Sequence, residues 1–210
     1  MVRVKICGIM DQASAWAAVE AGADAIGFVF TSSKREIAPD AAKAIIQSLP
    51  PYVTTVGVFV DEPLHRLNDL ANYCRLDLIQ LHGDESPVYC EHVDRPVVKT
   101  IKVKEASDLQ LISAYKHVTR ALLLDAYVAG EAGGTGHRLP WHLAVRAHEQ
   151  GTIILAGGLD ARNVEEAILA TRPFAVDVSS GVETDGRKDQ HKMLAFVQQA
   201  RAASRHLAIL

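Results

Sequence analysis

The sequence predicts an α/β protein whose 210 residues form one domain, 1–210, a single-domain (β/α)8 barrel of the TIM type with parallel strands. Three observations predict it. The length, with 49% hydrophobic residues, allows one sizeable core near the lower end of the range for such barrels. Eight short runs rich in Val, Ile, Leu and Phe recur along the chain, and segments with helical spacing lie between them.

The eight runs are more often continuously apolar than alternating, as expected for parallel strands that are buried on both faces. No hairpin pattern is evident, so parallel strands alone are expected. The predicted strands, in order, are Val2–Cys7, Ala25–Phe30, Thr55–Val60, Asp77–Leu81, Val97–Ile101, Ala121–Asp125, Thr152–Ala156 and Ala175–Val178.

The intervening segments place apolar residues on one helical face, as in Ala42, Ile45, Ile46 and Leu49. Residues that favour helix starts precede several of them: Asp11, Pro39-Asp40, Pro63, Asp160 and Asp189. A doubly wound open sheet is the alternative architecture. The absence of a GxGxxG motif after the first strand and the eight near-equal units favour the closed barrel.

Composition narrows the classes of function and partner. The formal net charge is only -3, and Lys and Arg are scattered, so we expect no nucleic-acid partner. No apolar run is long enough to span a bilayer and no basic, cleavable leader precedes the first strand, so we expect no membrane association and a cytoplasmic protein. Three cysteines without CxxC spacing and nine histidines without HExxH spacing suggest neither disulfides nor a metal site.

Active sites of β/α barrels lie at the carboxyl ends of the strands, and two reactive side chains stand there. Cys7 ends the first strand and could act as a nucleophile or a base, or it could be a small buried hydrophobe. Asp125 ends the sixth strand and could be a general acid, or it could cap a helix or anchor a loop.

Small residues follow the last two strands, where barrels of this type usually hold phosphate through backbone N–H groups. Gly157 and Gly158 follow the seventh strand, and Ser180 and Gly181 follow the eighth. Tight turns without ligand are the alternative. A glycine-rich segment that includes Gly134 interrupts the long stretch after the sixth strand, where glycines permit a close approach to ligand.

Four further polar residues near strand ends are candidates for substrate binding. Lys5 could supply charge near a phosphate, and Arg35 could hold a carboxylate through two hydrogen bonds or be a solvated loop charge. Gln80 and His82 end the fourth strand, where His82 could bind substrate or serve only as a structural donor.

Taken in order, the motifs resemble the phosphoribosylanthranilate isomerase family nearly from end to end. They are Lys5-Ile6-Cys7-Gly8-Ile9, Gly27-Phe28-Val29-Phe30, Ser33-Lys34-Arg35, Gln80-Leu81-His82-Gly83, Leu124-Asp125-Ala126, Gly133-Gly134-Thr135-Gly136, Ala156-Gly157-Gly158-Leu159 and Asp177-Val178-Ser179-Ser180-Gly181-Val182-Glu183. The resemblance implies a cofactor-free isomerase of tryptophan biosynthesis that acts on phosphoribosylanthranilate. The sequence leaves a monomer or a homodimer open, because apolar helix faces can meet the barrel or another subunit. The chain departs from the family where Leu139-Pro140 precede Trp141, which bears on how that loop closes.

The resemblance also implies residue roles. Asp125 would protonate the furanose ring oxygen, and Cys7 as thiolate would then remove the C2 proton of the resulting Schiff base. Arg35 would hold the anthranilate carboxylate, and the glycines and serine after strands seven and eight would hold the phosphate. Another phosphate-binding barrel enzyme, or a non-catalytic barrel that binds a phosphorylated metabolite, is the alternative.

Overall fold

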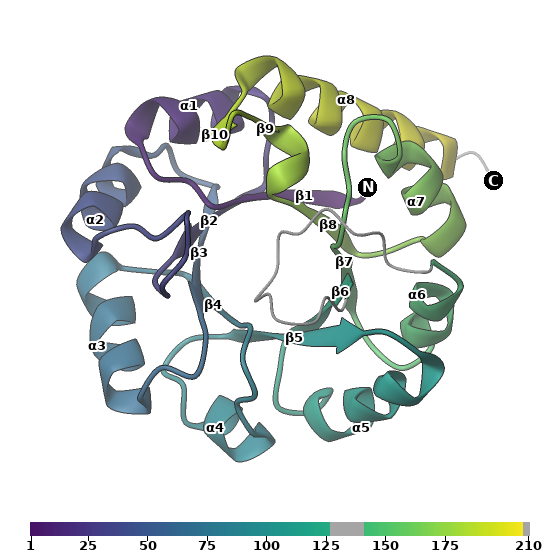
Figure 1. The fold of residues 1–210 in the computed structure, drawn as a ribbon, viewed down its shortest axis with the longest axis horizontal. Helices are drawn as coiled ribbons and strands as arrows, with labels where there is room; N and C mark the ends of the chain where they lie inside the picture. Colours follow the sequence, from purple (N-terminus) through teal and green to yellow (C-terminus); the bar gives the residue numbers. More distant parts are fainter. Residues whose placement is uncertain (127–140, 208–210) are drawn as a thin grey trace.

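The computed structural model describes residues 1–126 and 141–207, which form a closed barrel of eight parallel strands inside a ring of helices (Figure 1). The barrel predicted from sequence is confirmed, and the predicted strand bounds differ from the observed ones by at most two residues. The strands are β1 Arg3–Cys7, β2 Ala25–Val29, β3 Thr54–Phe59, β4 Leu78–Leu81, β5 Val97–Val103, β6 Ala121–Ala126, β7 Ile153–Leu155 and β8 Ala175–Val178.

Helices follow the strands around the barrel, as the apolar spacing predicts. They are α1 Gln12–Glu20, α2 Pro39–Ser48, α3 Leu64–Cys74, α4 Pro87–Glu91, α5 Ile112–Tyr115 after the 3-10 helix η1 Ala106–Leu111, α6 Trp141–His148, α7 Val164–Thr171 and α8 Gln190–Leu207. None of these described helices is long and apolar enough to cross a membrane.

The predicted helix starts hold with one correction. Asp11 caps α1 by accepting a hydrogen bond from the Ser14 backbone N–H at 2.8 Å. Asp160 does not begin α7, because the N-cap position belongs to Asn163. The Asp160 carboxylate instead accepts hydrogen bonds from Arg162, so it stabilises the turn that leads into the helix.

The barrel interior changes from apolar to polar toward the carboxyl ends of the strands. A small buried cluster fills its middle: Val98, Ala121, Leu123, Ile154, Ala156 and Ala175, with Leu78 packed against it. Two residues further along β4, β5, β6 and β8, on the same strand face, stand Gln80, Thr100, Asp125 and Asp177. The apolar layer therefore carries a polar layer directly above it.

A short antiparallel hairpin after β8 contradicts the expectation of parallel strands alone. It consists of β9 Glu183–Thr184 and β10 Arg187–Lys188, joined by Asp185 and Gly186 with φ of 51° and 76°. Asp-Gly is a favoured two-residue turn because both positions need positive φ. The sequence pattern does not reveal this hairpin because each strand has only two polar residues, too few to show a period.

Candidate active site

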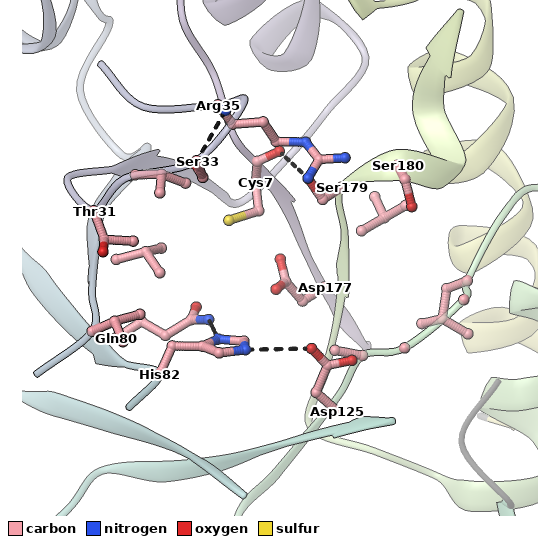
Figure 2. A pocket seen from close by; sticks show the side chains of 18 residues that line it. Cys7, Thr31, Ser33, Arg35, Gln80, His82, Asp125, Asp177, Ser179 and Ser180 are labelled. Atoms are coloured by element: carbon pink, nitrogen blue, oxygen red, sulfur yellow. Dashed lines mark hydrogen bonds and ion pairs between the residues drawn. The ribbon is translucent and has the colours of Figure 1, made fainter. Parts of the chain in front are cut away.

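A single pocket at the carboxyl ends of the strands collects most of the predicted site residues (Figure 2). Those that line it are Cys7, Arg35, Gln80, His82, Asp125, Gly157, Gly158 and Ser180. Lys5 and Gly181 lie outside this lining, and Gly134 lies outside the described residues. Among the described residues, no cluster of three His, Cys, Asp or Glu side chains could hold a metal ion.

Cys7 is the last residue of β1, and its side chain points into the pocket (Figure 2). The facing residue on β2 is Gly27, where a Cβ atom would lie 2.8 Å from the Cys7 Sγ. Burial raises the pKa of the Cys7 thiol, the Lys5 ammonium opposes this rise, and the Asp177 carboxylate adds to it. The thiolate that a base requires therefore depends on nearby positive charge.

Asp125 lies across the pocket near the end of β6, and its carboxylate faces His82, which follows β4 (Figure 2). The His82 Nε2 atom is 3.5 Å from Asp125 Oδ2, longer than a normal hydrogen bond but within ion-pair distance. Burial and the charges of Lys102, Lys5 and Lys99 lower the pKa of His82 to about 3. The imidazole is therefore neutral at neutral pH.

The hydrogen-bond network determines which nitrogen of His82 carries the proton. The Lys5 ammonium can only donate, so the Gln80 Oε1 atom at 2.8 Å accepts. The Gln80 amide nitrogen then donates to His82 Nδ1, 3.2 Å away. Because Nδ1 accepts, a neutral His82 carries its proton on Nε2, the atom that faces Asp125.

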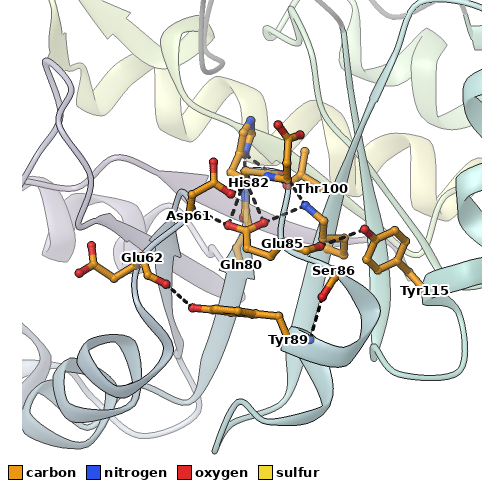
Figure 3. Close-up of polar contacts among 12 residues, drawn as sticks. Asp61, Glu62, Gln80, His82, Glu85, Ser86, Tyr89, Thr100 and Tyr115 are labelled. Atoms are coloured by element: carbon orange, nitrogen blue, oxygen red, sulfur yellow. Dashed lines mark hydrogen bonds and ion pairs between the residues drawn. The ribbon is translucent and has the colours of Figure 1, made fainter.

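The loop after β4 is held rigidly behind His82 (Figure 3). The buried Glu85 carboxylate accepts hydrogen bonds from the backbone N–H groups of Asp61 and Gly83. Lys99 forms an ion pair with Glu85 at 2.9 Å and also donates to the Gly83 carbonyl. These contacts fix the backbone immediately next to His82.

Arg35 reaches the pocket from the segment after β2 but is already bound to a carboxylate of this chain. Its Nε and Nη2 atoms donate to Glu183 Oε1 and Oε2 at 2.7 and 2.9 Å, and Lys188 donates to the same carboxylate at 2.7 Å. Both partners come from the β9–β10 hairpin. Glu183 therefore takes the Nε edge of the guanidinium, and a second carboxylate would have to use the opposite edge.

The two loops expected to hold phosphate contact one another closely. Gly157 and Gly158 have φ of 84° and 62°, a conformation that other residues rarely adopt. At Gly181, a Cβ atom would lie 1.9 Å from the Leu159 carbonyl oxygen, so only glycine allows this approach. The packing of the two loops sets the rim of the pocket.

Three residues were absent from the predicted site. Asp177 lines the pocket at the end of β8, and Glu183 and Lys188 hold Arg35. Asp177 occupies the same place on its strand as Asp125 on β6, so strand position was a usable signal for it. Nothing in the sequence links the hairpin to Arg35, which lies 148 positions away from Glu183.

Comparison with known proteins shows the family of the chain. The model of the N-(5'-phosphoribosyl)anthranilate (PRA) isomerase family matches residues 4–199. The chain belongs to this family. An N-(5'-phosphoribosyl)anthranilate isomerase of Moorella thermoacetica is 51% identical over 207 residues, which cover 98% of this chain and 92% of that protein. One from Geobacter metallireducens is 50% identical, over 96% of this chain and all of its own.

Solved structures of the family superpose closely on the barrel. Phosphoribosyl anthranilate isomerase from Thermotoga maritima is 40% identical with a TM-score of 0.90, covering 96% of this chain and 100% of that one. A phosphoribosyl anthranilate isomerase in complex with reduced 1-(o-carboxyphenylamino)-1-deoxyribulose 5-phosphate has a TM-score of 0.87 at 40% identity, with the same coverage.

Proposed function

We propose that this chain catalyses the Amadori rearrangement of N-(5-phosphoribosyl)anthranilate in tryptophan biosynthesis, with Cys7 as base and Asp125 as acid. The observation that carries the proposal is that both side chains, from β1 and β6, line one pocket. The rim of that pocket includes Gly157, Gly158 and Ser180. Family membership supports the reaction, and the pocket geometry supports the assignment of roles.

The steps follow from what each group can exchange. Asp125 donates a proton to the furanose ring oxygen, so the ring opens to a Schiff base. Cys7 as thiolate then takes the C2 proton to give an enolamine, which tautomerises to the ketose. After donation, the Asp125 carboxylate faces the Nε2–H of His82, and this neutral donor favours the charged form of the acid. No metal or cofactor takes part in these steps.

The two ends of the substrate carry different anionic groups, a phosphate and a carboxylate, and each needs its own binding site. The phosphate would lie against the backbone N–H groups of Gly157, Gly158, Ser180 and Gly181. The anthranilate carboxylate would meet Arg35, whose position the hairpin fixes. Contacts from Gly134, a cytoplasmic location, and a monomeric or homodimeric state stay predictions. A Thermotoga maritima relative is described as a dimeric isomerase from which monomers were generated.

The test is turnover of phosphoribosylanthranilate by the purified protein, with the ketose product separated chromatographically. Cys7→Ala and Asp125→Ala should each lower kcat about 10²–10⁴-fold with little change in KM, because general acid and base groups act in the transition state. Cys74→Ala is the matched control, since this thiol lies buried in α3 away from the pocket. Wild-type turnover in either pocket variant would overturn the assigned roles.

A further inference from the structure

Lys5 is a buried cation inside the barrel, and the reaction steps proposed above assign it no role. Its side chain is 7% exposed and lies outside the pocket lining. The ammonium is 2.8 Å from Gln80 Oε1 and 2.9 Å from Asp177 Oδ1. A lysine so deeply buried is rare and requires partners that keep it charged. Despite burial, Asp177 and Cys7 raise the pKa of Lys5, so it stays an ammonium.

The first connection, called the first arm below, runs from the Lys5 ammonium to the Cys7 thiol. Lys5 and Cys7 are two residues apart on β1 and therefore share its inner face. Opposite them, Gly27 has no side chain, and a Cβ there would contact both Cys7 Sγ, at 2.8 Å, and Lys5 Cε, at 3.0 Å. Because Gly27 has no side chain, the Lys5 methylene chain and the Cys7 sulfur can both pack against the backbone of β2 at this residue.

The second connection, called the second arm below, runs from the Lys5 ammonium to the Asp125 carboxylate. Because Lys5 makes Gln80 Oε1 an acceptor, the Gln80 amide must donate to His82, and His82 must present Nε2–H toward Asp125. Two side chains, Gln80 and His82, thus connect the ammonium to the acid. Without Lys5, the Gln80 amide could turn around and the proton of His82 could move to Nδ1.

We propose that Lys5 is a positioning residue shared by both catalytic groups: its ammonium stabilises the Cys7 thiolate, and through Gln80 it orients the His82 N–H that serves Asp125. The proposal rests on the roles given above to Cys7 and Asp125. The other charged groups near the thiol are Asp177, which opposes the thiolate, and Lys188, which favours it.

The first experiment measures alkylation of Cys7 by iodoacetamide against pH, with the modified peptide quantified by mass spectrometry. Lys5→Met should move the profile to higher pH, and at any pH below the pKa the alkylation rate should fall about tenfold for every pH unit that the profile moves. Asp177→Asn, an isosteric change, should move the profile to lower pH. Cys74 and Cys90 in the same samples are internal controls, because both lie outside the pocket lining.

Opposite displacements of the profile by the two substitutions would distinguish a charge effect from a loosened structure, which would increase access in both. An unchanged profile in Lys5→Met overturns the first arm. If that variant does not fold, an unchanged profile in Asp177→Asn has the same consequence. Alkylation requires no turnover. These results therefore test the effect of Lys5 on the Cys7 thiolate even if Cys7→Ala were to show that the catalytic roles are wrong.

The second experiment observes the protons of His82 directly through its imidazole ¹⁵N chemical shifts. The wild type should show the Nε2–H tautomer, and Gln80→Met should convert it partly to Nδ1–H. The same substitution should lower kcat at least about tenfold with KM nearly unchanged, and should leave Cys7 alkylation at the wild-type rate. An Nδ1–H tautomer in the wild type, or unaltered chemical shifts in the variant, would overturn the second arm.

Discussion

The Arg35–Glu183 pair offers the sharpest quantitative prediction. Glu183→Gln keeps the size of the side chain but leaves two buried cations, Arg35 and Lys188, without their carboxylate. Their side chains are only 9% and 2% exposed, so water cannot replace the lost charge. Removing one partner of a buried ion pair costs at least about 3 kcal/mol. In a chain of this size, the melting temperature should fall by roughly 6–12 °C.

Urea unfolding at pH 7 measures the loss, and Arg162→Ala is the matched control. Arg162 pairs with Asp160 at the surface, with its side chain 87% exposed, so its removal should leave the free energy of unfolding nearly unchanged. In turnover, Glu183→Gln should raise KM more than it lowers kcat, because the residue orients a binding group. A loss of stability no larger than that of the control would refute the reasoning.

The penalty should also depend on pH. Burial opposes the charge of Glu183, yet hydrogen bonds from Arg35 and Lys188 hold its pKa below the ordinary 4.5. The carboxylate therefore contributes stability above that pH, and the contribution disappears as pH falls through the lower folded pKa. The difference between wild type and Glu183→Gln should accordingly shrink on acidification.

Two more predictions concern the rest of the pocket. Gly181→Ala should raise KM at least about tenfold, because its Cβ would meet the Leu159 backbone oxygen at 1.9 Å, whereas Gly151→Ala, with its nearest neighbour at 4.0 Å, should not. His82 stays neutral in the fold down to pH about 3, so acid favours the unfolded chain, whose histidine titrates near 6.5. Urea unfolding should show wild type losing about 2 kcal/mol more between pH 7 and 5 than His82→Gln; equal losses would contradict this.

The fold was readable from sequence because each strand is a run buried on both faces. Such runs stand out whatever their partners are, so strands such as Ala175–Val178 were placed without error in their bounds. The ends of the strands then placed Cys7 and Asp125 at the same rim. The hairpin was not predicted, because strands of two residues show no periodicity and its only sequence signal is the turn dipeptide Asp185-Gly186.

The partners within the site could not be predicted, because they join residues that are far apart in the chain. Lys5 and Asp177 are separated by 172 positions and meet only through the register of β1 against β8. The neutral state of His82 likewise depends on burial and on lysines from other strands. Sequence position could suggest which side chains reach the rim, but not which of them hydrogen-bond to one another.

The pairing of β1 with β8 closes the barrel, and it also brings the proposed base next to its charged neighbours. The first strand of the chain supplies Cys7 and Lys5, and the last supplies Asp177. A nascent or partly unfolded chain that lacks the final strand therefore lacks the carboxylate that pairs with Lys5 and opposes the Cys7 thiolate. The complete barrel therefore sets the balance of charges around the thiol, so the reactivity of Cys7 toward oxidants and electrophiles should differ between an incomplete and a complete barrel.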